Sequence, residues 1–249
     1  MGEITLKDLL EAGVHFGHQT KRWNPKMKPY IFMEKNGIHI IDLQKTLDLT
    51  LKARDAVRKA SENGREVLFV GTKPQAKNAI RDEALRCGMP YVTERWLGGT
   101  LTNFNTIRNS LDKLDYLENI ETDGRIDQFK KKEALMLSKQ KAKLLKSLGG
   151  IRTMSGVPAI VFIVDTKKEI NAVREARKLK VPIIGMIDTN ADPGEADFPI
   201  PSNDDAMRAI NLFCKMVADA CLEGKAKFLE GREIAPPVED KPEGRETAA

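Results

Sequence analysis

The acidic residues best placed for chemistry follow two short apolar segments. Residues 160–164 (IVFIV) are followed by Asp165, and residues 183–187 (IIGMI) are followed by Asp188, each with a threonine next in the chain. Short runs rich in Ile and Val, without polar alternation, are typical of strands covered on both faces. Open α/β sheets usually bind ligands at the carboxyl ends of parallel strands. This pattern raises the hypothesis of an α/β enzyme or nucleotide-binding protein that uses Asp165 and Asp188.

The other groups that such an enzyme needs are missing from the sequence. Gly71-Thr72-Lys73 follows a further apolar run and precedes a predicted helix, which hints at phosphate binding at the helix N-terminus. The spacer and second glycine of a P-loop are absent, however, and so is a nucleophile elbow. An Asp-Thr pair after a strand more commonly caps the next helix or turn. The enzyme and nucleotide-binding interpretations are therefore kept only as alternatives.

The segment GVHFGHQTKRWNPKMKPYI, residues 13–31, is rich in cations, amides and aromatic rings and has no acidic residue. Its glycines and prolines make it a poor helix and a poor strand, so an irregular loop is expected. Such a loop suits phosphate contacts and stacking on bases or sugars. The alternative is a solvated basic loop with Phe16 and Trp23 packed into the core. We predict RNA contact by His15, His18, Gln19, Lys21, Arg22, Trp23, Asn24, Lys26 and Lys28.

A metal ion could bind at the edge where the strands end. Asp204 and Asp205 open the last predicted helix, and helix starts share one rim of the sheet with strand ends. Crowded carboxylates repel one another unless something positive lies among them: a basic side chain, a helix N-terminus or a metal. With a histidine from the basic loop they form a mixed set suited to structural zinc, namely His18, Asp188, Asp204 and Asp205. The alternative is that the helix-start acids complement the helix dipole, Asp188 holds a turn and His18 contacts RNA or backbone.

The elements that must position these residues form an α/β fold. Apolar residues recur at helical spacing between the two central strands, which predicts a strand–helix–strand unit with a right-handed crossover. Lys35-Asn36-Gly37 lies between two short apolar runs and predicts a β-hairpin. Helices are expected from Asp42 to about Glu62 and from Asn203 through Cys221. The prediction is a parallel sheet flanked by helices.

Residues 104–148 have a different pattern. Apolar residues step by threes and fours on both sides of a break at Thr122-Asp123-Gly124. This predicts an antiparallel, coiled-coil helical hairpin that protrudes and folds independently of the core of a single α/β domain, residues 1–103 and 149–231. Its basic second arm is either an ordinary solvated face, a polybasic arm on RNA, or a docking arm for another protein. We predict RNA contact by Lys130, Lys131, Lys132, Lys139 and Lys143, and by Arg95 before the helical hairpin.

Composition is consistent with a polyanionic partner. The net charge is +5 over 249 residues, and the pI is about 9.0. The three cysteines lack metal or redox spacing and are predicted to be buried thiols. Without an apolar run of membrane length or a targeting segment, a cytoplasmic protein is expected. Residues 232–249 have no apolar period and are predicted to be a disordered tail.

Six segments resemble the bacterial form of the small-subunit ribosomal protein two family. They are GVHFGHQTKRWNPKM, FVGTKPQA, ERWLGGTLTNF, FIVDTKKEINAVREA, PIIGMIDTNADP and IPSNDDA, and they span about residues 5 to 225 in the family's order. The resemblance implies a flavodoxin-like parallel sheet, no catalysis, no required cofactor and a place on small-subunit ribosomal RNA between head and body. It also implies a part in holding the large messenger-binding ribosomal protein one, with no membrane partner and no homo-oligomer.

Three functions can be compared on this basis. A structural constituent of the small ribosomal subunit accounts for the basic loop and the basic arm. An enzyme would need catalytic groups that are missing, and a scaffold that binds only proteins would not need an acid-free segment from Val14 to Ile31. The sequence therefore favours the ribosomal protein.

Overall fold

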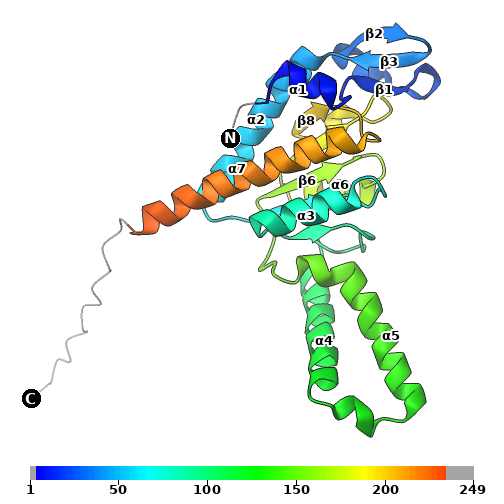
Figure 1. Ribbon diagram of the computed structural model, residues 1–249, viewed down its shortest axis with the longest axis vertical. Coiled ribbons are helices and arrows are strands. Elements are labelled where there is room, and N and C mark those ends of the chain that lie inside the picture. Colours follow the sequence, from blue (N-terminus) through cyan, green and yellow to red (C-terminus); the bar gives the residue numbers. More distant parts are fainter. Residues whose placement is uncertain (1–3, 234–249) are drawn as a thin grey trace, which may run out of the picture.

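The structure, a computed structural model, describes residues 4–233 (Figure 1). The tail predicted from residue 232 lies outside the described residues, apart from its first two residues, which form the end of the last helix. Among the helices of the described chain, none has both the length and the apolar character needed to cross a membrane. The three cysteines are buried free thiols, as the sequence predicted.

A five-stranded parallel sheet forms the centre of the protein. Its spatial order is β5-β4-β6-β7-β8, and each neighbouring pair is parallel. This is the doubly wound order of flavodoxin-like folds, so the predicted fold class is confirmed. Strands β6 and β7 are buried at every position, which is why they read as unbroken apolar runs. The strands are β4 (Val67–Val70), β5 (Tyr91–Val92), β6 (Ile160–Val164), β7 (Ile183–Ile187) and β8 (Phe198–Pro201).

Helices cover both faces of this sheet. On one face, Phe69 and Phe162 pack against the apolar sides of three helices, including Phe213. On the other face, Leu68 and Val161 pack against a fourth helix and the base of the helical hairpin. The first three helices are α2 (Leu43–Glu62), α3 (Lys77–Cys87) and α7 (Met207–Glu233), and the fourth is α6 (Ile170–Lys178); the short helix α1 (Leu6–Glu11) packs on α2.

A small antiparallel sheet lies at the N-terminal end of the chain. Strands β2 (Ile31–Lys35) and β3 (Ile38–Ile41) form the predicted β-hairpin. The turn residues Asn36 and Gly37 have φ values of 53° and 73°, the left-handed conformation that a type I′ turn requires. Strand β1 (Phe16–Gln19) pairs with β3 on its other side.

The expectation that residues 13–31 are irregular was therefore wrong in part. Besides β1, the segment forms two 3₁₀ helices, Thr20–Arg22 and Pro25–Tyr30. Strand β1 exists because β3 supplies its backbone partners, a contact distant in sequence. Gly17 permits this close approach, since a Cβ there would lie 2.6 Å from the Thr189 side chain.

The predicted helical hairpin is formed by α4 (Phe104–Thr122) and α5 (Lys131–Leu148), and it projects away from the sheet (Figure 1). Its coiled-coil character stays a prediction. Its base is not independent of the sheet, because Ile107, Leu111 and Leu148 are buried in the same apolar cluster as Leu68 and Val161. The helical hairpin therefore has a base that belongs to the domain core and a distal part that does not.

Two deletions should separate these parts. Replacing Asp115–Lys141 with a short Gly-Ser link keeps Ile107, Leu111 and Leu148, so urea unfolding should remain cooperative with a midpoint close to that of the intact chain. Replacing Asn105–Ser147 removes two buried core side chains, each of which should cost roughly 2–5 kcal/mol of the free energy of unfolding. Equal stability of the two deletions would contradict the division of the helical hairpin at its base.

Candidate functional site

The carboxyl end of the central sheet carries a cluster of carboxylates around one lysine. The Lys73 ammonium nitrogen lies 2.7 Å from Asp204 Oδ1, 2.6 Å from Asp205 Oδ1 and 3.5 Å from Asp165 Oδ2. Lys73 comes from the loop after β4, Asp165 from the end of β6, and the other two acids from the segment before α7. The positive group expected among these carboxylates is thus a side chain that the sequence analysis did not identify.

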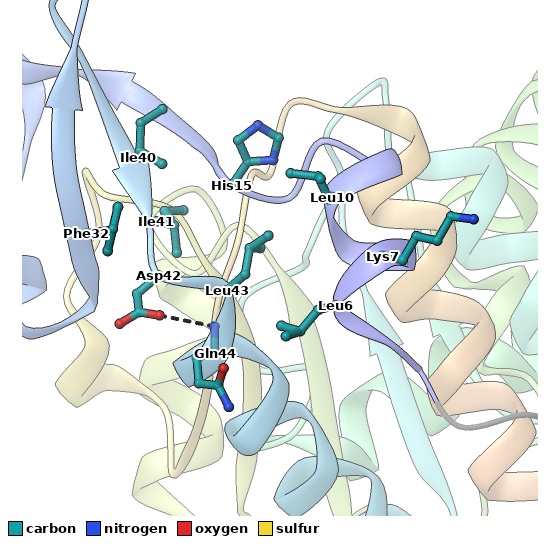
Figure 2. Close-up of a pocket in the computed structure, with 10 residues that line it drawn as sticks. All are labelled: Leu6, Lys7, Leu10, His15, Phe32, Ile40, Ile41, Asp42, Leu43 and Gln44. Atoms are coloured by element: carbon teal, nitrogen blue, oxygen red, sulfur yellow. Dashed lines mark hydrogen bonds between the residues drawn. The ribbon is translucent and has the colours of Figure 1, made fainter.

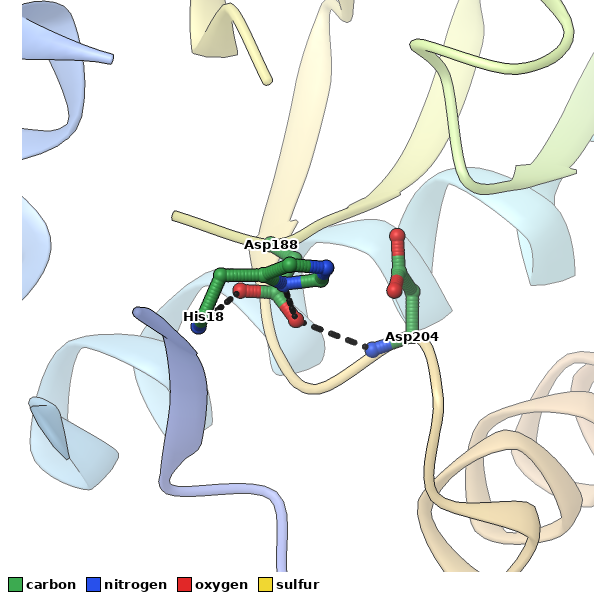
Figure 3. A group of neighbouring side chains, drawn as sticks. All are labelled: His18, Asp188 and Asp204. Carbon is green, nitrogen blue, oxygen red and sulfur yellow. Dashed lines mark hydrogen bonds and ion pairs between the residues drawn. The ribbon is translucent and has the colours of Figure 1, made fainter. Parts of the chain in front are cut away.

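A histidine from β1 completes the cluster (Figure 3). His18 Nδ1 lies 2.9 Å from Asp188 Oδ2, and its Nε2 lies 3.6 Å from Asp205 Oδ2. The His18 backbone N–H also donates to Asp188 Oδ1 and to Thr189 Oγ1, at 3.2 and 2.9 Å. These contacts attach the N-terminal sheet to the end of β7. The structure therefore brings the four residues of the predicted metal set to one place, although metal binding itself stays a prediction.

Asp204 is the most perturbed group in the cluster. Its side chain is buried, and its Oδ2 has no hydrogen-bond partner within the described part of the chain. Burial, followed by the charges of Asp165 and Asp188, raises the pKa of Asp204 to about 7, although Lys73 opposes the shift. The hydrogen bond to Asp188 raises the pKa of His18 against the effect of burial. Near neutral pH the Asp204 carboxyl can therefore exchange a proton.

Lys73 is held firmly in its charged form. Burial alone would lower the pKa of its ammonium group, but hydrogen bonds to Asp204 and Asp205 outweigh burial and raise it. The same ion pair lowers the pKa of Asp205 against the effect of burial. Lys73 therefore acts as a permanent counter-charge at this rim.

The Gly-Thr-Lys turn does not offer a phosphate site. The Thr72 N–H and hydroxyl both donate to Glu169 Oε1, at 2.8 and 2.5 Å, and Glu169 is buried. An internal carboxylate thus occupies the donors that a phosphate would need, and its charge would repel one. The nucleotide-binding alternative loses the observation that supported it.

The basic loop, residues 13–31, is hydrogen-bonded to the segment that follows β7. The Asn24 N–H donates to the Thr189 carbonyl at 2.8 Å, and the Asn24 side chain accepts from the Lys26 N–H. Trp23 packs on the ring of His39 with centroids 5.2 Å apart. Lys26 Nζ lies 2.5 Å from Asp192 Oδ2. The remaining polar side chains of the predicted set are exposed, namely Gln19, Lys21, Arg22 and Lys28.

The other residues predicted to contact RNA are also on the surface. Arg95 is exposed in the loop after β5. The helical hairpin that carries the predicted lysines lies well away from β1 and the basic loop (Figure 1). In contrast, Lys141 forms an ion pair with Glu121 on the facing helix. The exposed lysines are Lys130, Lys131, Lys132, Lys139 and Lys143.

His15 lies apart from these cations, in an apolar groove of about 500 Å³ between α1, β2 and β3 (Figure 2). Phe32 and Leu10 line this groove, with 71% and 55% of their surfaces exposed. Burial lowers the pKa of His15, which favours a neutral ring in this setting. The sequence analysis missed the groove. The available signal was the pair of adjacent apolar residues Phe32 and Met33 in the predicted β-hairpin, because neighbouring side chains of a strand point to opposite faces and both are exposed here.

An α/β fold whose rim carboxylates are held by Lys73 and His18, and whose cations are displayed on loops and helices, has the surface of a binding protein. The model of the family described as ribosomal protein S2 matches residues 9–224. The chain belongs to this family, and it is accordingly a structural ribosomal protein without catalytic activity.

Curated relatives agree over nearly the whole chain. The small ribosomal subunit protein uS2 of Nitratiruptor sp. is 56% identical over 96% of this chain and 91% of its own length. The uS2 protein of Chlorobium phaeovibrioides is 56% identical over 94% of this chain and 91% of its own length. That of Treponema pallidum is 52% identical over 99% of this chain and 84% of its own length. These bacterial relatives place the chain on the ribosome, in the cytoplasm.

Proposed function

We propose that this protein binds small-subunit ribosomal RNA through its basic loop and helps to hold the messenger-binding ribosomal protein one on the small subunit. The observation that carries the RNA part is the arrangement of Lys21, Arg22 and Lys28. They are exposed, and they form no ion pair with any residue of the described chain. Its relatives are named small ribosomal subunit proteins, which supports the same assignment.

The anchoring of the basic loop favours RNA binding. His18 at its start and Asn24 at its middle are both hydrogen-bonded to the end of β7. The cations between and after these anchors are therefore presented from a fixed backbone, which lowers the ordering cost of binding. Phosphate contacts of this kind position a protein on folded RNA without reading a base sequence.

A triple variant tests the basic loop. Lys21→Ala/Arg22→Ala/Lys28→Ala should bind small subunits depleted of this protein more weakly than the unaltered chain. Each lost phosphate contact should reduce the slope of log affinity against log salt by roughly 0.7 to 0.9. The measurement is co-sedimentation over a range of salt concentrations.

The matched control is Lys52→Ala/Lys59→Ala/Lys215→Ala, which removes three exposed cations from α2 and α7. This control should retain the affinity and the salt slope of the unaltered chain. If the loop variant and the control behave alike, the loop is not an RNA contact.

The apolar groove supports the second part of the proposal. Exposed apolar surface of this kind usually marks a protein contact. The groove is lined by Phe32, Leu10 and Leu6, whose side chains are exposed to solvent, and Lys7 lies at its edge (Figure 2). We take its occupant to be an apolar segment of the messenger-binding ribosomal protein one, with an acidic residue to face Lys7.

A charge placed in the groove should release that partner. Small subunits carrying Phe32→Asp should retain the messenger-binding protein at least tenfold less well in co-sedimentation, because the carboxylate cannot be desolvated there. Leu85→Asp is the control, since Leu85 is similarly exposed but lies on α3, away from the groove. Equal retention with both variants would remove the groove from the assignment.

We further propose that the rim cluster binds a structural zinc ion. One ligand atom each from His18, Asp188 and Asp204 lies within 4.8 Å of the others, and the unpartnered Asp204 Oδ2 is a ready ligand. Imidazole with carboxylates is a donor set that zinc accepts. The hydrogen bond to Asp188 favours the protonated form of His18, and this form must lose a proton before it can ligate a metal, so affinity should rise with pH.

Zinc retention after exhaustive dialysis tests the site. Purified protein loaded with zinc should keep about one ion per chain. His18→Ala and Asp204→Asn should lose it, whereas His15→Ala, outside the cluster, should keep it. Retention should be greater at pH 8 than at pH 6, because burial and the neighbouring carboxylates raise the pKa of Asp204 to about 7. Substoichiometric zinc in the unaltered chain, or equal zinc in all variants, would remove the site.

A further inference from the structure

Helix α6 and its two flanking turns present a surface of a single charge sign. From residue 167 to residue 180, every exposed charged side chain is a lysine or an arginine. The exposed face of α2 differs, because Asp48 and Asp55 alternate there with Lys52 and Lys59, as is usual for a solvated helix. The cations of the α6 surface are Lys167, Lys168, Arg174, Arg177, Lys178 and Lys180.

The two acids of this segment, Glu169 and Glu175, accept internal hydrogen bonds. Glu175 accepts hydrogen bonds from Trp96 Nε1 at 2.9 Å and from the Gly99 and Leu101 N–H groups at 2.8 and 3.0 Å. It also accepts from both the N–H and the hydroxyl of Thr102. Glu169 is bound by Thr72 in the same way. Neither carboxylate is left to neutralise the cations on the outer side of the helix.

The Glu175 contacts also fix the loop that precedes the helical hairpin. Trp96 is buried and hydrogen-bonded to Glu175. The loop from Trp96 to Thr102 is therefore attached to α6 through several backbone and side-chain donors. The exposed Arg95 directly precedes this fixed loop.

Two acids of a neighbouring stretch, Asp192 and Glu195, face this surface. Asp192 is already bound by Lys26 of the basic loop. Arg177 acts electrostatically on both acids, and Arg174 acts on Glu195. Lys167 Nζ donates to the Asn190 carbonyl in the same stretch. The α6 surface is therefore linked to the basic loop through residues 190–195.

We infer that the exposed face of α6 is a second surface for the RNA phosphate backbone. This inference rests on the proposed RNA-binding function and adds a contact that the basic loop does not supply. Residues three and four apart on a helix lie about 5–6 Å from each other, so Arg174, Arg177 and Lys178 form one patch. The patch lacks the aromatic side chains that usually dominate protein–protein interfaces. A patch made only of cations favours the negatively charged RNA backbone as its partner.

The test is Arg174→Ala/Arg177→Ala/Lys178→Ala in the full chain, assayed on small subunits depleted of this protein. The salt slope of binding should fall by roughly 2 to 3, since each phosphate contact contributes about 0.7 to 0.9. The conservative variant Arg174→Lys/Arg177→Lys should keep the slope, and the Lys52, Lys59 and Lys215 control should match the unaltered chain. Thermal unfolding midpoints are compared in parallel to establish that each variant is folded.

The outcomes separate this inference from the function on which it rests. If the unaltered chain binds and the α6 variant has the same affinity and slope, the α6 surface is not an RNA contact and the proposed function stands. Weaker binding with an unchanged slope would assign the face to a neighbouring protein and overturn the RNA assignment. Failure of the unaltered chain to bind depleted subunits would overturn both.

Discussion

The ammonium group of Lys73 is the interaction on which the carboxyl end of the sheet depends. It neutralises Asp204, whose buried carboxylate would otherwise lie next to Asp165 and Asp188 in a region of low dielectric. Asp188 is in turn the acceptor for His18 of β1. One half-buried charge thus stabilises the carboxylates to which the N-terminal sheet and the basic loop are attached.

Internal carboxylates fix the two loops where enzymes of this architecture usually bind phosphates. Glu169 accepts a hydrogen bond from the backbone of the turn after β4, and Glu175 accepts one from the backbone of the loop after β5. Both acids come from the segment that follows β6, so this one segment organises its neighbours on either side of the rim. The result is a rim whose loops are fixed by internal hydrogen bonds, as suits a structural protein.

Local features of the fold were readable from the sequence because each is determined by a few adjacent residues. Asp42 caps α2 at the predicted position, and Asn36-Gly37 forms the turn of the β-hairpin. The buried strands β6 and β7 were recognisable because both of their faces are covered.

Features that depend on distant segments were not readable. Strand β1 is stabilised by β3, which lies beyond two 3₁₀ helices. Lys73 and Asp204 are 131 positions apart, so only the folded sheet identifies them as an ion pair. The role of Glu175 likewise appears only when α6 packs beside the loop from residue 96 to residue 102. An amphipathic pattern predicted α6 but could not indicate which of its charges point inward.

The place of the helical hairpin in the chain has a consequence for folding kinetics. Strands β4 and β6 are neighbours in the sheet, yet the whole helical hairpin separates them in sequence. If α4 and α5 associate first, the hairpin brings its own two ends together and shortens the effective loop that must close. Leaving out the helical hairpin roughly halves this loop, so the saving in loop-closure entropy is about 0.6 kcal/mol. An insertion that lengthens the chain therefore need not slow formation of the central β4–β6 pair, because its contacts are local.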